Sequence, residues 1–398
     1  MILPDINQPR LVVPTALPVQ RAGLVAIIRD FTPNWFTVTM GTGITALALN
    51  QLPFAGAGLH DVGTVLWLLN ILLFVTFSAL YAARWVLFYD EARRILGHSV
   101  MSMFFGAIPM GLATIINGFL AFGIPWLGAP AAVGIATALW WIDAAMAVVC
   151  GIGVPFLMFT RHDHSMEKMT AVWLLPIVAA EVAAASAGQL LPHLAGGSME
   201  LTVLALGYAL WAFSVPLALS LLVILFLRLV LHKLPHRDMA ASGCLALGPI
   251  GTGALSLLLL GAAAPHAFAT VGLADIGQMA RGIGIIGGLA LWGYGVWWFL
   301  LAVLTTLRYL QREGMPFNLG WWGFTFPLGV YSVATLALAH QTGLALFSVI
   351  GTGLVLLLAV LWTMIAVRTA IGAFQRKLFV SPCRVRGSIP SDFTADEV

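Results

Sequence analysis

The side chains of this sequence that could take part in chemistry are two acids and an amide, each inside a long apolar stretch. Asp143 and Glu181 fall near the middle of two neighbouring stretches, and Asn117 lies in the stretch before them. Each stretch is long enough to cross a bilayer. Placing an aspartate there costs about 2.5–3.5 kcal/mol, so such acids are candidates for function. Asn117 is most simply predicted to donate an interhelical hydrogen bond.

The two acids have three possible roles. Asp143 and Glu181 could form structural pairs away from any solute path, be protonated because they are buried, or carry a proton that is coupled to the movement of a solute. An ionised acid that lined a path for anions would repel the cargo, so that arrangement is disfavoured.

A second feature is the uncharged run from Gly314 to Ala339, in which Phe326 stands directly before Pro327. A proline inside a helix removes one backbone donor and kinks the helix, and lipid tolerates this only where neighbouring groups satisfy the freed carbonyl. The ring of Phe326 is then held where the helix is irregular. We interpret this run as the gated part of a conduit.

The composition is that of a polytopic membrane protein. Hydrophobic residues make up 60% of the chain and charged residues only 9%, against about 25% charged residues in a soluble domain. The first thirty residues lack the apolar core of a signal peptide, so the first span is expected to stay in the mature protein. Three distant cysteines give no disulfide or metal pattern. We expect a lipid bilayer as surroundings, and no cofactor, metal or nucleic acid as partner.

The apolar pattern predicts ten membrane helices. They cover residues 33–52, 62–88, 99–122, 131–159, 170–191, 201–231, 241–264, 282–309, 317–340 and 344–371. The predicted domains are a segment over 1–32 with a short amphipathic surface helix from Arg21 to Phe31, a membrane domain over 33–371, and a polar tail over 372–398.

The basic residues predict the orientation of these helices. With ten spans, 18 of the 19 lysines and arginines fall on one face, and Arg281 alone falls on the other. Cytoplasmic loops carry the excess of basic residues, so both termini are predicted to be cytoplasmic. Arg281 could attract anions at the outer mouth, although a lone interfacial arginine can also simply extend its side chain to the membrane surface.

Prolines and glycines recur in the odd-numbered helices and indicate an internal repeat. Pro109, Pro176, Pro249 and Pro327 are predicted to interrupt helices 3, 5, 7 and 9, and the run Gly41-Thr42-Gly43 takes this place in helix 1. Irregular backbone at membrane depth is expected only where protein or water covers it. We therefore predict an all-α membrane fold of five helical hairpins, with odd helices around a central path and even helices outside. The alternative is that these residues only allow tight helix packing.

The expected path carries few charges, which limits what it could conduct. Glu181 is the only ionisable side chain in mid-span of an odd helix, and no lysine or arginine lies at mid-depth. A tight dicarboxylate site would be expected to present basic side chains to both ends of its ligand. Interrupted helices instead offer N-termini with partial positive charge, which suit a small anion.

A membrane-embedded enzyme is the alternative class of function. Arg161-His-Asp-His164 and the nearby Glu167 resemble a metal-binding fragment, but no cysteine accompanies them and the signal is weak. No catalytic triad, phosphate-binding loop or haem-ligating pair is evident in the sequence, so this class is disfavoured.

Several motifs resemble the tellurite-resistance/dicarboxylate transporter family, which includes the plant guard-cell slow anion channels. The resemblance covers roughly Phe31 to Cys383 and is closest to fungal sulfite efflux pumps. The stretches that carry it are Phe31-Thr-Pro-Asn-Trp-Phe36, Met40-Gly-Thr-Gly43, Pro109-Met-Gly-Leu-Ala-Thr-Ile-Ile-Asn117, Leu139-Trp-Trp-Ile-Asp143, Thr160-Arg-His-Asp-His164, Trp173-Leu-Leu-Pro-Ile177 and Trp321-Trp-Gly-Phe-Thr-Phe-Pro327.

This resemblance implies five helical hairpins in a pseudo-five-fold array, often assembled as a trimer, with a phenylalanine that plugs the pore of each protomer. That phenylalanine corresponds best to Phe326, and Phe324 is the second choice. Glu181 departs from the neutral residue expected in many relatives, which counts against simple channel behaviour and adds a little weight to proton coupling among the three roles considered above. The resulting hypothesis is export of sulfite or a similar small anion across a cell membrane. The competing hypothesis is a carrier of C4-dicarboxylates such as malate.

Overall fold

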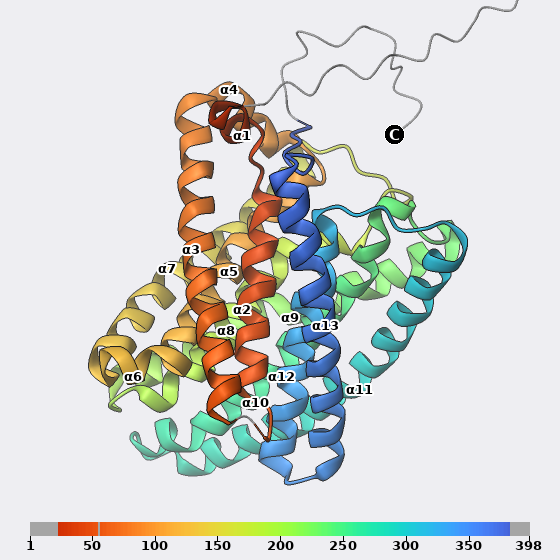
Figure 1. Ribbon diagram of the computed structural model, residues 1–398. Helices are drawn as coiled ribbons and strands as arrows, with labels where there is room; N and C mark the ends of the chain where they lie inside the picture. The colour runs from red at the N-terminus through yellow and green to blue at the C-terminus, as the bar shows by residue number, and fades with distance from the viewer. Residues whose placement is uncertain (1–22, 55, 383–398) are drawn as a thin grey trace, which may run out of the picture.

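The computed structural model describes residues 23–54 and 56–382, and these residues form an all-helical membrane protein (Figure 1). The predicted surface helix is present as α1 (Leu24–Asp30). Its expected start at Arg21, most of the segment 1–32 and the tail beyond residue 382 lie outside the described residues.

Nine helical spans in the described part of the chain are long and apolar enough to cross a membrane. They are Ala57–Leu87, Met101–Leu127, Ala129–Thr160, Ala171–His193, Ser198–His232, Arg237–Ala269, Ala274–Arg312, Leu319–Thr342 and Ala345–Phe374. Each overlaps one of the predicted helices. The first predicted helix corresponds to α2 (Phe36–Asn50), which has 15 residues, preceded by the 3₁₀ turn η1 (Pro33–Trp35).

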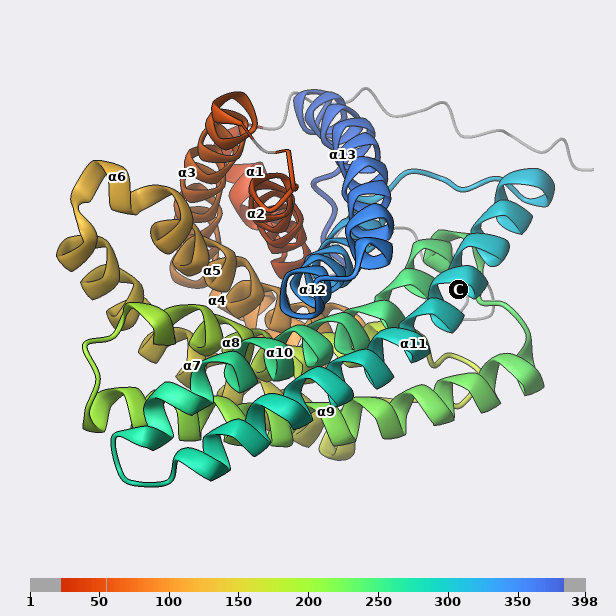
Figure 2. The same cartoon turned by 90° about the horizontal axis from the view of Figure 1, so that it is seen from below.

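Burial divides the long helices into two sets. The inner helices are almost entirely covered by protein: α2, α5 (Ala107–Gly118), α8 (Leu175–Leu190), α10 (Leu247–Ala269) and α12 (Thr325–Thr342). In each outer helix, only 22–33% of the residues in the most apolar stretch are buried inside the protein. The outer helices are α3 (Ala57–Leu87), α7 (Ala129–Thr160), α9 (Ser198–His232), α11 (Ala274–Arg312) and α13 (Ala345–Phe374). Figure 2 shows the inner helices near the middle and the outer helices around them.

The inner helices form a closed ring. Going round it, α2 contacts α5, α5 contacts α8, α8 contacts α10, α10 contacts α12, and α12 returns to α2. Each inner helix also packs against the outer helix that follows it in the chain, in the pairs α2–α3, α5–α7, α8–α9, α10–α11 and α12–α13. The chain therefore consists of successive helical hairpins with their shorter members inside.

A 3₁₀ segment leads into every inner helix. Besides η1, these segments are η3 (Met101–Gly106), η5 (Ala171–Leu174), η7 (Arg237–Ala246) and η8 (Leu319–Phe324). They lie at the end of the bundle that also holds α1, α4 (Tyr89–Ala92) and η2 (Arg93–Gly97), here called the basic end. The short elements of the opposite end are the π-helical turn η4 (Phe119–Gly123), α6 (Ile124–Leu127) and η6 (Leu191–His193).

The four recurring prolines do not kink their helices in mid-span, and that prediction was wrong. Pro109, Pro176, Pro249 and Pro327 all lie in the first three residues of their α-helices, directly after the 3₁₀ segments. The first amides of an α-helix have no intrahelical acceptor, so a proline there sacrifices no hydrogen bond. The helical breaks are changes from 3₁₀ to α geometry. Prolines inside α-helices are Pro155 in α7, Pro216 in α9 and Pro265 in α10.

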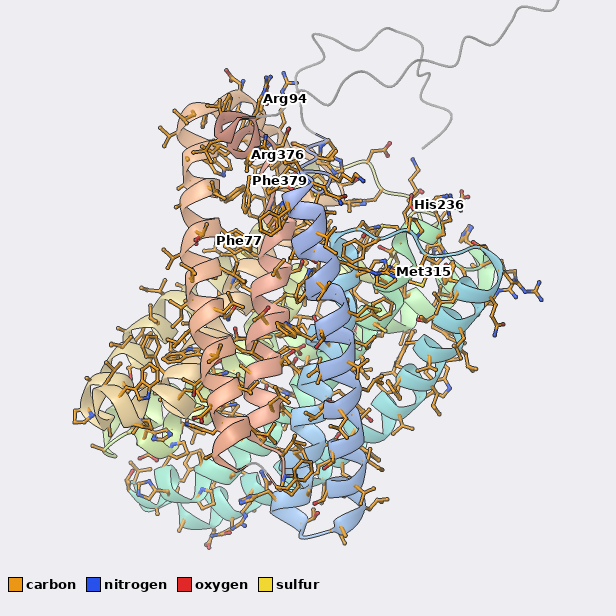
Figure 3. All side chains as sticks on the ribbon, viewed as in Figure 1. Phe77, Arg94, His236, Met315, Arg376 and Phe379 are labelled. Carbon is orange, nitrogen blue, oxygen red and sulfur yellow. The ribbon has the colours of Figure 1, made fainter. Side chains whose placement is uncertain are left out.

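The segment after α13 folds back over the start of α2 at the basic end. The ring of Phe379 stacks on Trp35, with 4.7 Å between the ring centres, and Trp35 in turn contacts Phe77 of α3 edge-on (Phe77 and Phe379 are labelled in Figure 3). The buried Arg84 donates to the hydroxyl oxygen of Ser381 over 2.9 Å and to the backbone oxygen of Phe31. These contacts join the two ends of the helical array.

Glycines allow the inner helices to approach almost to backbone contact. A Cβ atom added at Gly41 of α2 would lie 2.6 Å from a ring carbon of Trp322 and closer still to the hydroxyl oxygen of Thr325. One added at Gly251 of α10 would lie 2.8 Å from the backbone nitrogen of Tyr331 in α12. Because real Cβ atoms do not approach other atoms so closely, a larger residue at these positions would force the ring open.

We therefore expect Gly41→Ala to destabilise the protein by about 1–3 kcal/mol, the usual cost of overpacking a core. The matched control is Gly153→Ala on the outer helix α7, where nothing lies within 4 Å of the added Cβ. Since alanine favours helix more than glycine by about 1 kcal/mol, the control should be neutral or stabilising. Thermal unfolding of purified protein in detergent measures both variants. Equal stability of the two would contradict the close packing described for Gly41.

Candidate transport path

Two cavities lie inside the ring, one after the other along the inner helices. The inner cavity has a volume of about 220 Å³ and is lined near the basic end by residues from all five 3₁₀ segments or the helix starts beside them. Representative lining residues are Thr37, Phe104, Leu175, Leu245 and Gly323.

The outer cavity lies further along the same helices and is much smaller. All five inner helices line it, through residues that include Ile44, Asn117, Val182, Thr252 and Val330. Its volume is about 20 Å³, which is room for about one water molecule. A solute with several non-hydrogen atoms does not fit, so the path is closed at this level.

Phe326 lies where the two cavities meet. Its ring lines the outer cavity and is 2% exposed, whereas the inner cavity ends on the same chain segment at Gly323. Val330 and Val333 follow Phe326 on the same face of α12 and line the outer cavity with it. Phe324 points elsewhere, because it lines a separate cavity between α11 and α13 and packs edge-on against Trp321.

The outer cavity is apolar apart from a few uncharged polar groups. The hydroxyl oxygen of Thr252 and the amide oxygen of Asn117 are buried and have no hydrogen-bond partner among the described residues. Thr114 accepts a hydrogen bond from the amide nitrogen of Asn70 over 3.0 Å and donates to the backbone oxygen of Gly111 over 2.7 Å. Gln189 completes the polar lining. No lysine or arginine of the described chain lines either cavity; the one acid there is Asp238.

A solute that passed through the outer cavity would meet the hydroxyl oxygen of Thr252 and the amide oxygen of Asn117, which have no hydrogen-bond partner among the described residues. The sequence analysis predicted neither Thr252 nor Gln189 as a lining residue. The signal for Thr252 was present as Gly251-Thr-Gly253, a polar residue between two small ones in the most buried half of the helix. Gln189 carried no such signal.

Comparison with known proteins agrees with this arrangement. The family model described as voltage-dependent anion channel, SLAC1, matches residues 30–370. The chain belongs to this family. The SLAC1 family is one of channels and transporters, so this chain is a membrane transport protein of that family and not an enzyme.

Individual relatives cover most of the chain. A protein named sulfite efflux pump SSU1 from Arthroderma otae is 40% identical over 356 residues, which is 88% of this chain and 93% of the relative. The sulfite efflux pump SSU1 of Saccharomyces cerevisiae is 25% identical over 83% of this chain and 84% of its own length. The malic acid transport protein of Schizosaccharomyces pombe is 22% identical over 85% and 77% of the two chains.

In this SLAC1-family chain, the residues predicted to line the path at the first helix lie beside it. Gly41 packs against Trp322 and Thr325, and Gly43 against Thr114 and Asn70. The hydroxyl oxygen of Thr42 accepts a hydrogen bond over 3.1 Å from the indole of Trp362 in α13. None of the three lines either cavity, because helix rotation turns Ile44 and Leu47 toward the centre instead. The four recurring prolines also line neither cavity; they lie in the layer between them.

The two acids lie behind the wall of the path. Asp143 of α7 and Glu181 of α8 are fully buried, and neither lines a cavity. No described residue makes a geometrically acceptable hydrogen bond to either carboxylate. The hydroxyl of Ser214 in α9 lies near Glu181 but donates to the backbone oxygen of Ile177 over 2.8 Å. The structural pairing considered for these acids is therefore not seen. The amide oxygen of Asn117 also has no partner among the described residues, and the interhelical hydrogen bond predicted from its amide nitrogen is not seen there either.

The remaining predicted residues lie outside the path. Arg281 is exposed on the outer helix α11 and lines neither cavity. The ring of His162 bonds through Nε2 to the backbone oxygen of Leu96 over 2.8 Å, and the ring of His164 packs on Trp173. Within the described ranges, no group of three or more histidines, cysteines or acids is placed to hold a metal ion.

His98 supports the entrance to the inner cavity. Its Nδ1 accepts hydrogen bonds of 3.2 Å from the backbone nitrogens of Val100 and Met101, and both of these residues line that cavity. Burial lowers the pKa of His98 below its ordinary value of 6.5, and the neighbouring His162 adds to this effect. The neutral ring is the form that can accept both bonds.

This lowered pKa predicts a pH dependence of stability. The folded protein binds the proton of His98 less readily than the unfolded chain, so stability is complete above about pH 6.5 and falls as the pH drops below it. His98→Asn keeps an acceptor oxygen without the titration, and should reduce the fall in unfolding temperature between about pH 7 and pH 5. His232→Asn, at an exposed position in α9, is the control. An unchanged pH profile in His98→Asn would refute this role.

Proposed function

We propose that this chain is an exporter of sulfite or a similar small inorganic anion. In this proposal the inner and outer helices make ten spans, arranged as five hairpins with pseudo-five-fold symmetry around a central pore. The observation that carries it is the pair of successive cavities, the inner one lined from all five 3₁₀ segments or the helix starts beside them and the outer one by all five inner helices, with no described lysine or arginine in either lining. Uncharged dipoles and helix N-termini can stabilise an anion weakly enough to release it again.

The basic end faces the cytoplasm in this proposal, with both chain termini, and the membrane is the plasma membrane. Support comes from the excess of basic residues at that end and from the relatives named as efflux pumps. Positive charge near the inner mouth raises the local concentration of anions. An inside-negative potential then drives a monovalent anion outward with about 2.3 kcal/mol per 100 mV, so export needs no other energy source.

Phe326 is the gate in this proposal. Its buried ring lies at the boundary of the two cavities, and the space beyond it holds about one water. Phe324, the second choice, is less well supported because it lines a cavity outside the ring. The positions of Asp143 and Glu181 behind the wall favour passive movement over coupling to protons. Assembly as a trimer stays a prediction from family resemblance.

Sulfite is preferred over malate on two grounds. The relatives named sulfite efflux pump include one that is 40% identical, whereas the relative named for malic acid is 22% identical. In addition, neither cavity of the described chain presents the basic side chains expected for two carboxylates at once.

Competition between cargoes in proteoliposomes tests the function. We expect labelled sulfite to move, unlabelled sulfite to compete, and malate in tenfold excess to have little effect. Liposomes without protein give the background, because sulfite in its protonated forms crosses lipid by itself. The proposal fails if labelled malate moves while sulfite neither moves nor competes.

The gate is tested by Phe326→Ala, which should raise passive anion flux severalfold because it removes the ring at the boundary of the cavities. Phe347→Ala is the matched control: this phenylalanine is also buried, but it lies on α13 against Trp292. Flux through both variants is measured in the same proteoliposomes at equal protein content. A larger increase from Phe324→Ala than from Phe326→Ala would assign the gate to Phe324 instead.

A further inference from the structure

A third cavity opens on the outside of the ring, between two outer helices. Its walls are α11, through residues such as Val303 and Leu307, and α13, through Leu361 and Arg368. Its floor consists of inner elements, including Phe324 of η8 and Leu328 of α12. We call this space, with a volume of about 320 Å³, the lateral groove.

The lateral groove is apolar along its length and charged at one end. Nearly all of its lining is aliphatic, aromatic or sulfur-containing, and Thr306 is its one hydroxyl residue. Arg368 is its one charged residue. Met315, in the segment between α11 and η8, lies near that end of the groove, beside the upper part of α13. An apolar channel that ends in a single cation matches an amphiphile with one anionic end.

Aromatic rings hold the guanidinium of Arg368 at this position. Its central carbon lies 5.3 Å from the ring centre of Trp321 and 5.9 Å from that of Phe317. Such stacking on ring faces leaves the N–H edges of the guanidinium available. Arg368 is exposed and makes no ion pair or hydrogen bond with any described residue.

We propose that the lateral groove binds an anionic phospholipid, with an acyl chain along its walls and the phosphate at Arg368. The inference rests on the proposed orientation, because the basic end must face the cytoplasmic leaflet, where anionic lipids are concentrated. Basic pockets between membrane helices on that side suit such headgroups. A free soluble anion gains nothing from the apolar walls, and a second copy of the chain would have to place an acid beside Arg368.

The bound lipid would touch the same helical turn that carries the gate. Phe324 and Leu328 are four residues apart and share the face of the chain that lines the groove. Phe326, between them, points to the opposite face and lines the outer cavity. Trp321 links the headgroup end to this turn, since it contacts Arg368 and, with 5.9 Å between ring centres, Phe324. An occupied groove therefore supports the closed position of Phe326.

Binding is tested by native mass spectrometry of the detergent-purified protein with dioleoyl phosphatidylglycerol or dioleoyl phosphatidylcholine. The wild-type chain should retain the anionic lipid preferentially, and Arg368→Gln should retain about fivefold less of it, as expected for one basic group near an anionic headgroup. Arg308→Gln is the matched control. It also removes one exposed arginine near the basic end of the bundle, but Arg308 lies on α11 and does not line the groove. Thr306→Trp, which fills the groove and leaves Arg368 intact, should also lose lipid.

Three results would overturn the proposal. Equal lipid retention by Arg368→Gln and Arg308→Gln excludes Arg368 as the headgroup site. Displacement of the lipid by soluble glycerol phosphate would show that the groove walls add nothing, so that Arg368 is a simple anion site. A change of oligomeric state in Thr306→Trp without loss of lipid would make the groove a protein interface.

The link to the gate has its own measurement. Passive anion flux through wild-type protein should fall severalfold as phosphatidylglycerol replaces phosphatidylcholine in proteoliposomes, and this dependence should be lost in Arg368→Gln but kept in Arg308→Gln. A dependence that persists in Arg368→Gln contradicts the link. Lipid retention is measured without any cargo, so failure of sulfite transport and failure of the lipid site give different results.

Discussion

The close approach of the inner helices is the constraint on which the rest of this structure depends. At Gly251 a side chain would collide with the backbone of the next helix, and at Gly41 with Trp322 and Thr325. Such contacts let five helices close a ring whose interior holds two small cavities instead of a water-filled channel. They also keep lipid away from the 3₁₀ segments, whose irregular backbone could not face hydrocarbon.

Ring closure also determines where charge can lie. The described wall of the outer cavity carries no charged side chain, so its polarity comes from hydroxyl and amide groups such as Thr252 and Asn117. Asp143 and Glu181 lie behind this wall, where their carboxylates cannot repel an anion at close range. The basic residues gather at one end of the bundle, where they act on anion concentration instead of on binding at mid-depth.

The sequence predicted the helices and their pairing well, because apolar length and basic loops report directly on membrane crossing. It placed the four prolines wrongly because apolar runs do not distinguish a 3₁₀ segment from the α-helix that follows it. Pro109 looked central in its apolar run but begins α5. The sequence also could not predict which side chains of a helix point toward the path. Thr42 and Ile44 are two positions apart, yet Thr42 bonds to Trp362 and Ile44 lines the outer cavity. Only the packed neighbours decide that rotation.

The first turn of α12, where we propose the gate, faces a cavity on each of two sides. Pro327 is the third residue of α12, where an α-helix has no intrahelical acceptor for its amides, so the turn from Phe324 to Leu328 accommodates the proline without losing a hydrogen bond. Phe326 on one face meets the narrowest part of the path, while Phe324 and Leu328 on the other face meet the lateral groove. The lateral groove, with a volume of about 320 Å³, reaches this turn through both of these residues. For the proposed gate, the groove therefore provides space into which the turn can shift on the side away from the path.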